Sequence, residues 1–451
     1  MDSKSQHGMW SSRMAFILAA TGSAVGLGNI WRFPYLASDN GGGAFVLVYL
    51  GCIALVGLPI LMAEILIGRR GRMSPINTLE RVTAESGARR AWVGIGWIGI
   101  VAGILILSFY SVVAGWTLSY SWSFLTQLFG APAITDPGAT FSGLLGDPWV
   151  LTGWHALFMV LTLGVVGMGV EKGLERAVRF LMPSLLILLL VLVGYGATTG
   201  HLGQALGFLF NPDFSEIDGG VFLRAMGQAF FSLSLGMCTM MAYGAYLPKN
   251  VSIPRVGVTV ALADTSVALL AGLAIFPIVI SFGINPAGGG PGLIFTSLPL
   301  AFNAMPFGIV YGLLFFVLLA VAAWTSSISL MEPATAFLVE KTRLTRRSAA
   351  LAIGLVAWAL GLLSVLSLNH WSTVRIFGRD IMGTIELLAN DIMLPLGGLL
   401  IALFAGWALK SSVLREEVPE LSAGLFTAWR WLLRVVAPAL VLIVLKTMRL
   451  R

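Results

Sequence analysis

The chain has 451 residues, of which 57% are hydrophobic and 11% are charged, and its formal net charge is +7. Soluble globular domains carry roughly 25% charged residues, so this composition excludes a soluble domain and indicates a membrane protein. A spanning helix needs about 20 largely apolar residues, and eleven segments meet this requirement. They cover residues 12–36, 41–68, 91–125, 152–170, 178–198, 222–247, 256–283, 306–340, 347–367, 381–409 and 424–446. We therefore predict an all-α polytopic membrane protein with about 11 transmembrane helices in one domain, residues 1–451.

Lysine and arginine residues are unevenly distributed among the predicted loops. The loops at 126–151, 199–221 and 284–305 contain none, whereas the N-terminus and the alternate loops contain several. Because basic loops stay in the cytoplasm, we expect a cytoplasmic N-terminus, and we attribute the positive net charge to topology rather than to nucleic-acid binding. Arg375 and Arg379 are exceptions, and eleven spans would also leave the basic C-terminus outside, so the side of the C-terminus stays open.

Two apolar segments contain residues that weaken a helix at mid-membrane depth. Residues 22–29 read Gly-Ser-Ala-Val-Gly-Leu-Gly-Asn, and residues 230–236 read Phe-Phe-Ser-Leu-Ser-Leu-Gly. Irregular backbone is tolerated there only where it is buried in protein or lines a polar cavity. A broken helix presents free N–H and C=O groups, which suit a zwitterion and a cation. We predict two inverted five-span repeats, 12–198 and 222–409, with a binding site between them and an eleventh span at 424–446.

A longer pattern surrounds the first break. Trp10 and Arg13 precede Gly-Ser-Ala-Val-Gly-Leu-Gly-Asn-Ile-Trp-Arg-Phe-Pro at 22–34, and Asn-Gly-Gly-Gly-Ala-Phe follows at 40–45. This pattern resembles the first helix of the neurotransmitter:sodium symporters. The resemblance continues through Glu64 with Gly68 and Arg69, Tyr110 six residues before Trp116, residues 228–236, and Thr325-Ser326-Ser327 followed by Pro333. This resemblance implies the LeuT-type fold with broken helices 1 and 6. Within the family, the sequence pattern is similar to that of bacterial amino-acid symporters of the inner membrane.

The resemblance also implies two sodium sites beside the first break. The first would be formed by Ala24, Asn29, Ser232 and Asp264, and the second by Gly22, Val25, Ala322, Thr325 and Ser326. Depending on where gaps are placed, Asp264 aligns with an asparagine ligand of the first sodium or with a neighbouring acid. In both alignments a fixed negative charge lies near the ion, so we expect transport without bound chloride. A buried carboxylate in a span predicts a functional role even without the resemblance.

A substrate pocket follows from the same resemblance. Its residues would be Ser23, Ala24, Leu27, Gly28, Ile106, Tyr110, Phe231, Ser232, Ser234, Met237, Ser326 and Leu330. The amides of Leu27 and Gly28 and the Tyr110 hydroxyl would bind a carboxylate, because a half-helix start attracts negative charge. No charged residue is placed to meet a charged substrate side chain, and Met237 can adapt to several shapes. The pattern favours a neutral, hydrophobic L-amino acid.

Gates complete the set of residues implied by the resemblance. Arg32 and Glu386 would form the outer gate, with Asp391 as a competing partner, and Trp10, Tyr246 and Glu340 would belong to the inner gate. The family's inner-gate arginine falls at His7, so Lys4 or Arg13 would substitute for it, or His7 would make the gate sensitive to pH. Glu64 is expected to cap free amides of the broken sixth span.

The predicted function is sodium-coupled uptake of an amino acid by alternating access, with two Na⁺ ions as co-substrates. One alternative is a sensor of the same fold that does not transport. An intramembrane enzyme is disfavoured because the four histidines are scattered and no zinc motif or Gly-x-Ser-x-Gly elbow is found. A channel would need repeated polar rings, which the sequence lacks. The expected partners are the amino acid and the lipid bilayer, without nucleic acid.

Overall fold

The computed structural model describes residues 9–283 and 293–448, and within these ranges it consists of helices, the turns and loops that connect them, and two isolated β-bridges. Nine helical segments of the described chain are long and apolar enough to cross a membrane. A tenth candidate is a bent pair, Arg13–Ala24 with Gly28–Asp39, whose two parts meet at 49°. The segment predicted at 222–247 corresponds to two helices that are each too short to cross alone. The predicted all-α membrane architecture is confirmed.

The candidate spans are built from the following elements. They are α1 (Arg13–Ala24) with α2 (Phe33–Asp39), α3 (Gly43–Cys52) with α4 (Leu58–Gly71), α6 (Gly94–Gln127), α8 (Pro148–Val166), α9 (Arg176–Thr198), α13 (Ile253–Ser281), α15 (Gly308–Lys341), α16 (Arg346–Ser367), α17 (Ile381–Glu386) with α18 (Leu394–Leu403), and α20 (Ala423–Trp431) with α21 (Ala437–Met448). The broken sixth segment comprises α11 (Gly219–Ser232) and α12 (Thr239–Ala245). Shorter connecting helices are α5 (Pro75–Ser86), α7 (Pro137–Gly146), α10 (Leu202–Phe210), α14 (Leu298–Ala304) and α19 (Ser411–Glu417).

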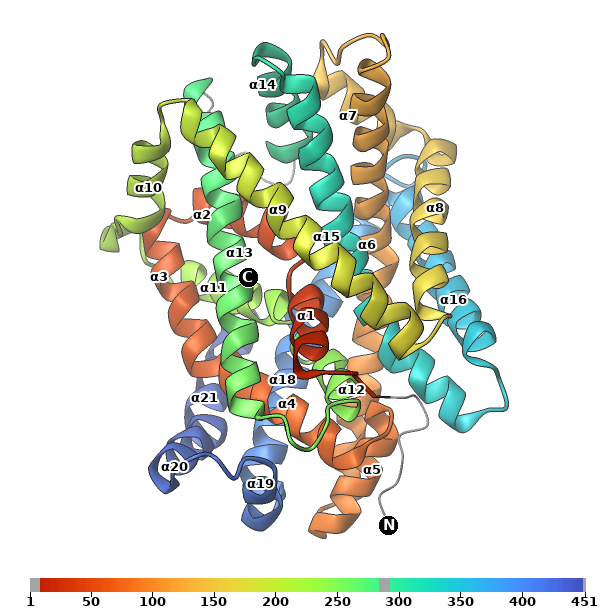
Figure 1. Ribbon diagram of the computed structural model, residues 1–451, viewed down its shortest axis with the longest axis vertical. Coiled ribbons are helices and arrows are strands. Elements are labelled where there is room, and N and C mark those ends of the chain that lie inside the picture. The colour runs from red at the N-terminus through yellow and green to blue at the C-terminus, as the bar shows by residue number, and fades with distance from the viewer. Residues whose placement is uncertain (1–8, 284–292, 449–451) are drawn as a thin grey trace.

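The two ends of the bundle differ in charge. Helices α7, α10 and α14 belong to the loops without lysine or arginine, and they lie toward the upper end in Figure 1. Helices α5 and α19, in loops that contain basic residues, lie at the opposite end. We call this lower end the basic end. The alternation of basic and non-basic loops along the chain therefore corresponds to two separate ends of one helical bundle.

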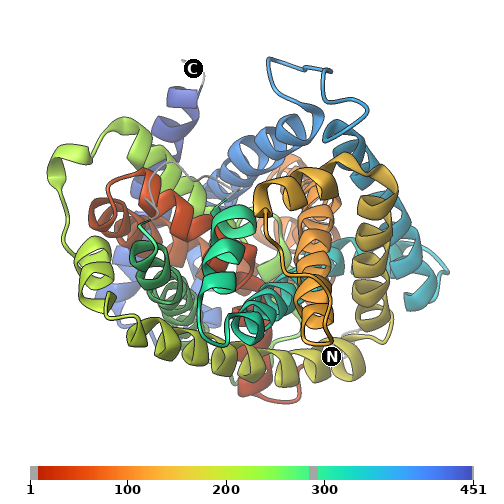
Figure 2. The ribbon, with the colours of Figure 1, turned by 90° about the horizontal axis from the view of Figure 1, so that it is seen from above.

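Helix α1 is enclosed by other helices, which explains why its weak helix formers are tolerated. It packs against α9, α13 and α15, and in Figure 1 α9 runs diagonally past it. Figure 2, seen from above, shows α9 along one margin of the bundle and α8 with α16 along another. Most of α1 is buried, including Gly22, Ser23 and Ala24. Polar backbone groups at this break therefore meet protein partners rather than lipid.

Both breaks are narrower than the sequence predicted. Helix α1 stays regular through Ala24, because the Val25 N–H still donates to the Thr21 carbonyl at 2.7 Å, and a π-helical turn begins at Gly28. The first break therefore covers residues 25–27 instead of 22–29. Helix α11 likewise continues through Ser232, so the second break lies at 233–238 instead of 230–236. Glycine weakens a helix by only about 1 kcal/mol, so packing can keep it helical.

Candidate substrate and ion site

Side chains from three segments form hydrogen bonds with backbone groups at and beside the first break. The Gly26 N–H donates to Asn29 Oδ1 at 3.2 Å, and the Leu27 N–H donates to the Tyr110 hydroxyl at 3.2 Å. Gln228 Nε2 donates to the Gly28 carbonyl at 2.8 Å. Buried backbone groups of this kind require partners, so these three bonds make the irregular conformation affordable inside the bundle.

The second break depends on Glu64 and on left-handed backbone. Glu64 Oε1 accepts from the Gly236 N–H at 2.8 Å, which is the capping role expected from the sequence. Ser234, Gly236 and Cys238 all have positive φ. For the two non-glycine residues this conformation costs about 1–2 kcal/mol each, so the surrounding packing must enforce it. A Cβ at position 236 would lie 2.2 Å from the Leu394 carbonyl oxygen, which leaves room only for glycine.

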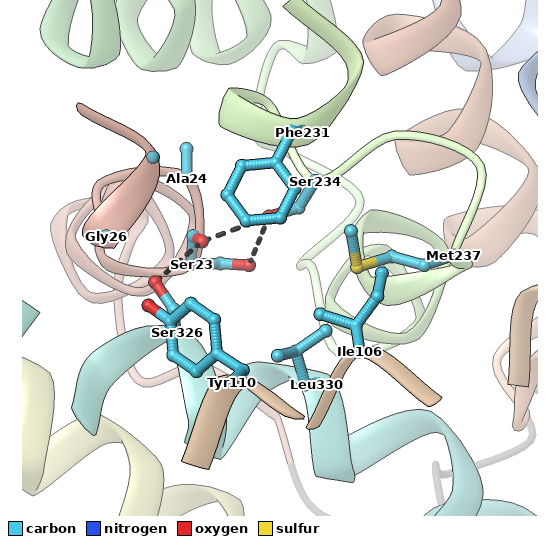
Figure 3. A pocket seen from close by; sticks show the side chains of 11 residues that line it. Ser23, Ala24, Gly26, Ile106, Tyr110, Phe231, Ser234, Met237, Ser326 and Leu330 are labelled. Carbon is cyan, nitrogen blue, oxygen red and sulfur yellow. Dashed lines mark hydrogen bonds between the residues drawn. The ribbon is translucent and has the colours of Figure 1, made fainter. Parts of the chain in front are cut away.

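The two breaks face each other across a small hollow (Figure 3). Its lining consists of Ser23, Ala24, Gly26, Gly28, Ile106, Tyr110, Phe231, Ser234, Met237, Ser326 and Leu330. All of these except Gly26 were predicted for the substrate pocket, whereas the predicted Leu27 and Ser232 are not among the lining residues. The volume is about 20 Å³, which is room for roughly one water molecule. An amino acid could enter only if part of this lining moved.

The hollow has a polar side and an apolar side. Ser23, Tyr110 and Ser326 point into one side, and Ile106, Met237 and Leu330 form the other (Figure 3). Ser23 Oγ donates to Ser329 Oγ at 2.9 Å, and Ser234 Oγ donates to the Ser23 carbonyl at 3.0 Å. The hydroxyls and the backbone of α1 can therefore bind the charged groups of a zwitterion while the aliphatic side receives an apolar side chain.

Asp264 joins α13 to the residues that flank the two breaks. Its carboxylate accepts from Asn29 Nδ2 at 2.7 Å, from Ser232 Oγ at 2.5 Å and from the Tyr49 hydroxyl at 3.3 Å. Asp264 is fully buried, and no lysine or arginine of the described chain forms an ion pair with it. The structure thus brings together three predicted ligands of the first sodium, with Ala24 at the end of α1 nearby on the hollow. A cation here would balance an otherwise uncompensated buried charge.

The residues predicted for the second sodium also lie together, between α1 and α15. Thr325 Oγ1 donates to the Ala322 carbonyl at 2.9 Å, and Ser326 Oγ donates to the Val25 carbonyl at 3.3 Å. A Cβ on Gly22 would lie 3.5 Å from Thr325 Cβ, so the backbone of α1 passes close to the threonine. This cluster offers neutral oxygens from two helices, which suits a hard monovalent cation.

Among the residues predicted for the outer gate, Arg32 stacks on the Phe231 ring, with 5.0 Å between Cζ and the ring centroid. Glu386 and Asp391 are both close enough to interact with it electrostatically. Neither acid forms an ion pair with Arg32 within 4.0 Å in the described chain, and two nitrogens of Arg32 have no hydrogen-bond partner there. Direct contacts therefore do not show whether Glu386 or Asp391 is the gate partner of Arg32.

Trp10 and Tyr246, predicted for the inner gate, belong to a larger cluster of bonded residues than the sequence predicted. The Trp10 N–H donates to the Tyr246 carbonyl, and its indole donates to the Tyr243 carbonyl, both at 3.1 Å. The Tyr246 hydroxyl donates to Glu332 Oε1 at 2.7 Å, and Glu332 forms an ion pair with Arg346. Sequence reasoning missed Glu332 and Arg346, although an acid inside an apolar span was a visible signal.

Glu340, the third residue predicted for the inner gate, forms hydrogen bonds at the start of α5. Glu340 accepts hydrogen bonds from the Ser74 N–H at 2.8 Å and from Asn77 Nδ2 at 2.6 Å, which anchors the start of α5 to the end of α15. His7 and Lys4, proposed for the inner gate, lie outside the described residues.

Comparison with known proteins places this geometry in a family. The family model for the sodium:neurotransmitter symporter family matches residues 7–131 and 148–450. An uncharacterized sodium-dependent transporter of Bacillus subtilis (strain 168), YhdH, is 38% identical, with 96% of each chain covered. Another uncharacterized sodium-dependent transporter, from Haemophilus influenzae, is 32% identical, with 97% of each covered.

A solved structure gives the same answer for the fold. The crystal structure of MhsT in complex with L-phenylalanine matches with a TM-score of 0.90 and 44% sequence identity, covering 97% of this chain and 99% of that one. The predicted fold class is thereby confirmed. These matches cover both breaks, the hollow and both clusters of oxygen atoms. The chain belongs to the sodium:neurotransmitter symporter family, whose members are sodium-dependent membrane transporters and not enzymes.

Proposed function

We propose that this protein takes up a neutral L-amino acid with a hydrophobic side chain, together with Na⁺, by alternating access. The observation that carries the proposal is the hollow between the two breaks, with hydroxyls and backbone on one side and Ile106, Met237 and Leu330 on the other. Among the residues that the structure describes, no charged side chain lines it. MhsT, 44% identical, was solved with L-phenylalanine, which supports a substrate of this class.

We further propose two sodium ions and no chloride. The first ion would bind beside Asp264 and Asn29, and the second beside Thr325 and Ser326. Asp264 supplies a fixed negative charge, so an added anion is not needed for balance. Because the first ion would lie near the substrate carboxylate, each would strengthen the binding of the other by the same factor.

Two ions moved with one zwitterion make transport electrogenic. Each elementary charge gains about 2.3 kcal/mol per 100 mV, so two charges gain about 4.6 kcal/mol, enough for an accumulation of roughly three orders of magnitude. We place the protein in a bacterial inner membrane with its N-terminus in the cytoplasm. The two repeats, 12–198 and 222–409, would each contribute two spans to a bundle of spans 1, 2, 6 and 7, and this bundle would rock against the remaining spans around the site.

The decisive experiment is uptake into proteoliposomes under an imposed sodium gradient, with each of the twenty amino acids. We expect accumulation of hydrophobic amino acids and a charge-to-substrate ratio of two in the same vesicles. Binding without accumulation would favour the sensor of the same fold. Uptake that is unchanged when gluconate replaces chloride would support chloride independence, and a strict chloride requirement would contradict it.

A matched pair of variants on α15 tests the second ion site. Thr325 and Thr335 are both buried, and both donate their hydroxyl to a carbonyl of the preceding turn. Thr325 lies beside Gly22 of α1, whereas Thr335 lies ten residues, about 15 Å, further along α15. Thr325→Val should lower sodium affinity at least tenfold, and Thr335→Val should leave it within twofold. Equal sodium affinities for both threonine variants would refute the second assignment.

The first ion site is tested by Asn29→Ala, which should abolish sodium-stimulated binding while the protein remains monodisperse.

A further inference from the structure

A second hollow lies on the outer surface of the bundle at the basic end, where the last turns of α8 face the first turns of α16. Its volume is about 450 Å³. The walls include Val160, Met168 and Leu351, whose exposed fractions are 62%, 51% and 51%. Helices α8 and α16 lie at the margin of the bundle (Figure 2), and the apolar window of each span is only 39% buried. These walls therefore face the acyl chains of the bilayer.

Two glycines account for the shape of this groove. A Cβ on Gly164 would meet no atom within 4 Å, so the missing side chain leaves open space. A Cβ on Gly167 would lie 3.6 Å from Cγ of Arg347, so the aliphatic stem of that arginine lies over the glycine at the mouth of the groove. The groove is thus an apolar slot with a guanidinium at the end nearest the basic loops.

The charge of Arg347 is not balanced by any acid in the part of the chain that the structure describes. Residues 341–347 contain four basic residues and no acid. Lys341 pairs with Glu80 at 3.7 Å, and Arg346 pairs with Glu332. Within residues 9–283 and 293–448, Arg343 and Arg347 form no ion pair, and of these two only Arg347 lines the groove.

We propose that this groove binds one anionic glycerophospholipid from the leaflet at the basic end. An acyl chain would fill the slot beside Gly164, and the phosphate would bind the guanidinium of Arg347. A basic residue at the membrane surface attracts an anionic lipid, and arginine binds phosphate oxygens in a bidentate manner. A zwitterionic lipid would make the apolar contact in the slot but would carry no net negative charge to attract Arg347. A soluble phosphate would carry the negative charge but would have no acyl chain to fill the slot.

The test measures lipid binding to the purified full-length protein by native mass spectrometry. Phosphatidylglycerol and phosphatidylcholine of the same chain length are titrated in separate samples, and glycerol phosphate is added as a competitor. We expect one saturable phosphatidylglycerol, bound at least fivefold more tightly than phosphatidylcholine and not displaced by glycerol phosphate. Equal binding of the two lipids, or displacement by glycerol phosphate, would overturn the proposal.

Two matched pairs of variants locate the site. Arg347→Gln should weaken phosphatidylglycerol binding about fivefold, the effect of one surface cation, whereas Arg343→Gln should change it less than twofold. Gly164→Leu should fill the slot and weaken binding at least fivefold. Gly153→Leu is its control, since Gly153 lies on the same face of α8 about 16 Å away and a Cβ there also meets open space. Equal effects within both pairs would show that no defined site exists, and the arginine pair decides if a leucine variant fails to fold.

Discussion

Gly26 offers a sharp test of the hollow, because its lack of a side chain allows two functional groups to approach the break. A Cβ built on Gly26 would lie 2.3 Å from Ser326 Oγ and 2.8 Å from the Tyr110 hydroxyl. The φ of Gly26 is not in the left-handed region, so alanine can adopt the backbone conformation without strain. Gly26→Ala would therefore act through steric overlap alone.

The expected loss of affinity in Gly26→Ala can be estimated from the two side chains that the new methyl group would displace. Ser326 would have to rotate away from the Val25 carbonyl, and Tyr110 would have to withdraw from the Leu27 N–H. Each such hydrogen bond contributes about 1 kcal/mol, and overpacking a filled site costs about 1–3 kcal/mol. A penalty of about 1–3 kcal/mol corresponds to a roughly 5- to 150-fold loss of affinity.

The assay is equilibrium binding of the preferred amino acid at saturating sodium, followed by sodium titration at saturating amino acid. Gly26→Ala should weaken both, because Tyr110 belongs to the proposed substrate pocket and Ser326 also to the second ion site. Gly51→Ala is the control, since a Cβ there meets no atom within 4 Å, and it should bind like the wild type. If Gly26→Ala binds both ligands within twofold of the wild type, the hollow is not the site.

Three further outcomes follow from the same structure. Arg346→Gln leaves the buried Glu332 carboxylate without its cation, so the melting temperature in detergent should fall by an amount equivalent to about 3–5 kcal/mol, and adding Glu332→Gln should restore part of it. Gly68→Ala would place a Cβ 1.9 Å from the Met241 carbonyl oxygen, a backbone atom, and we expect little folded protein on size-exclusion chromatography. Met237→Ala enlarges the apolar side of the hollow, so competition assays should show a relative gain for tryptophan over leucine.

The residues expected around the hollow came from the family resemblance, and polar groups inside apolar spans gave a second signal. Ser23, Tyr110 and Ser326 come from three different segments, and each interrupts a hydrophobic run. Their positions relative to two broken helices follow from the family resemblance. The structure places these side chains around one volume together with the apolar residues expected opposite them.

Other features could not be read from sequence, each for a physical reason. Gly26 lines the hollow with its backbone, and glycine has no side chain that marks it as a lining residue. The exact limits of both breaks depend on packing, which keeps Gly22 and Phe230 helical despite unfavourable neighbours. The pairing of Glu332 with Arg346 joins the interior of α15 to the start of α16 across a turn, so helical periodicity does not predict it.

The buried acids show why one place in this bundle calls for a cation. Five acids are buried in the described chain: Glu64, Glu175, Asp264, Glu332 and Glu417. Three of them form ion pairs with arginine side chains, and Glu64 accepts a backbone N–H just before α12, where the helix dipole supplies positive charge. Asp264 lies in the middle of α13 and receives only neutral side-chain donors. Among these five acids, only Asp264 lacks both a protein cation and a helix start. It contacts Asn29 beside the first break and Ser232 beside the second, so a sodium ion there would link ion binding to the conformation of both broken helices.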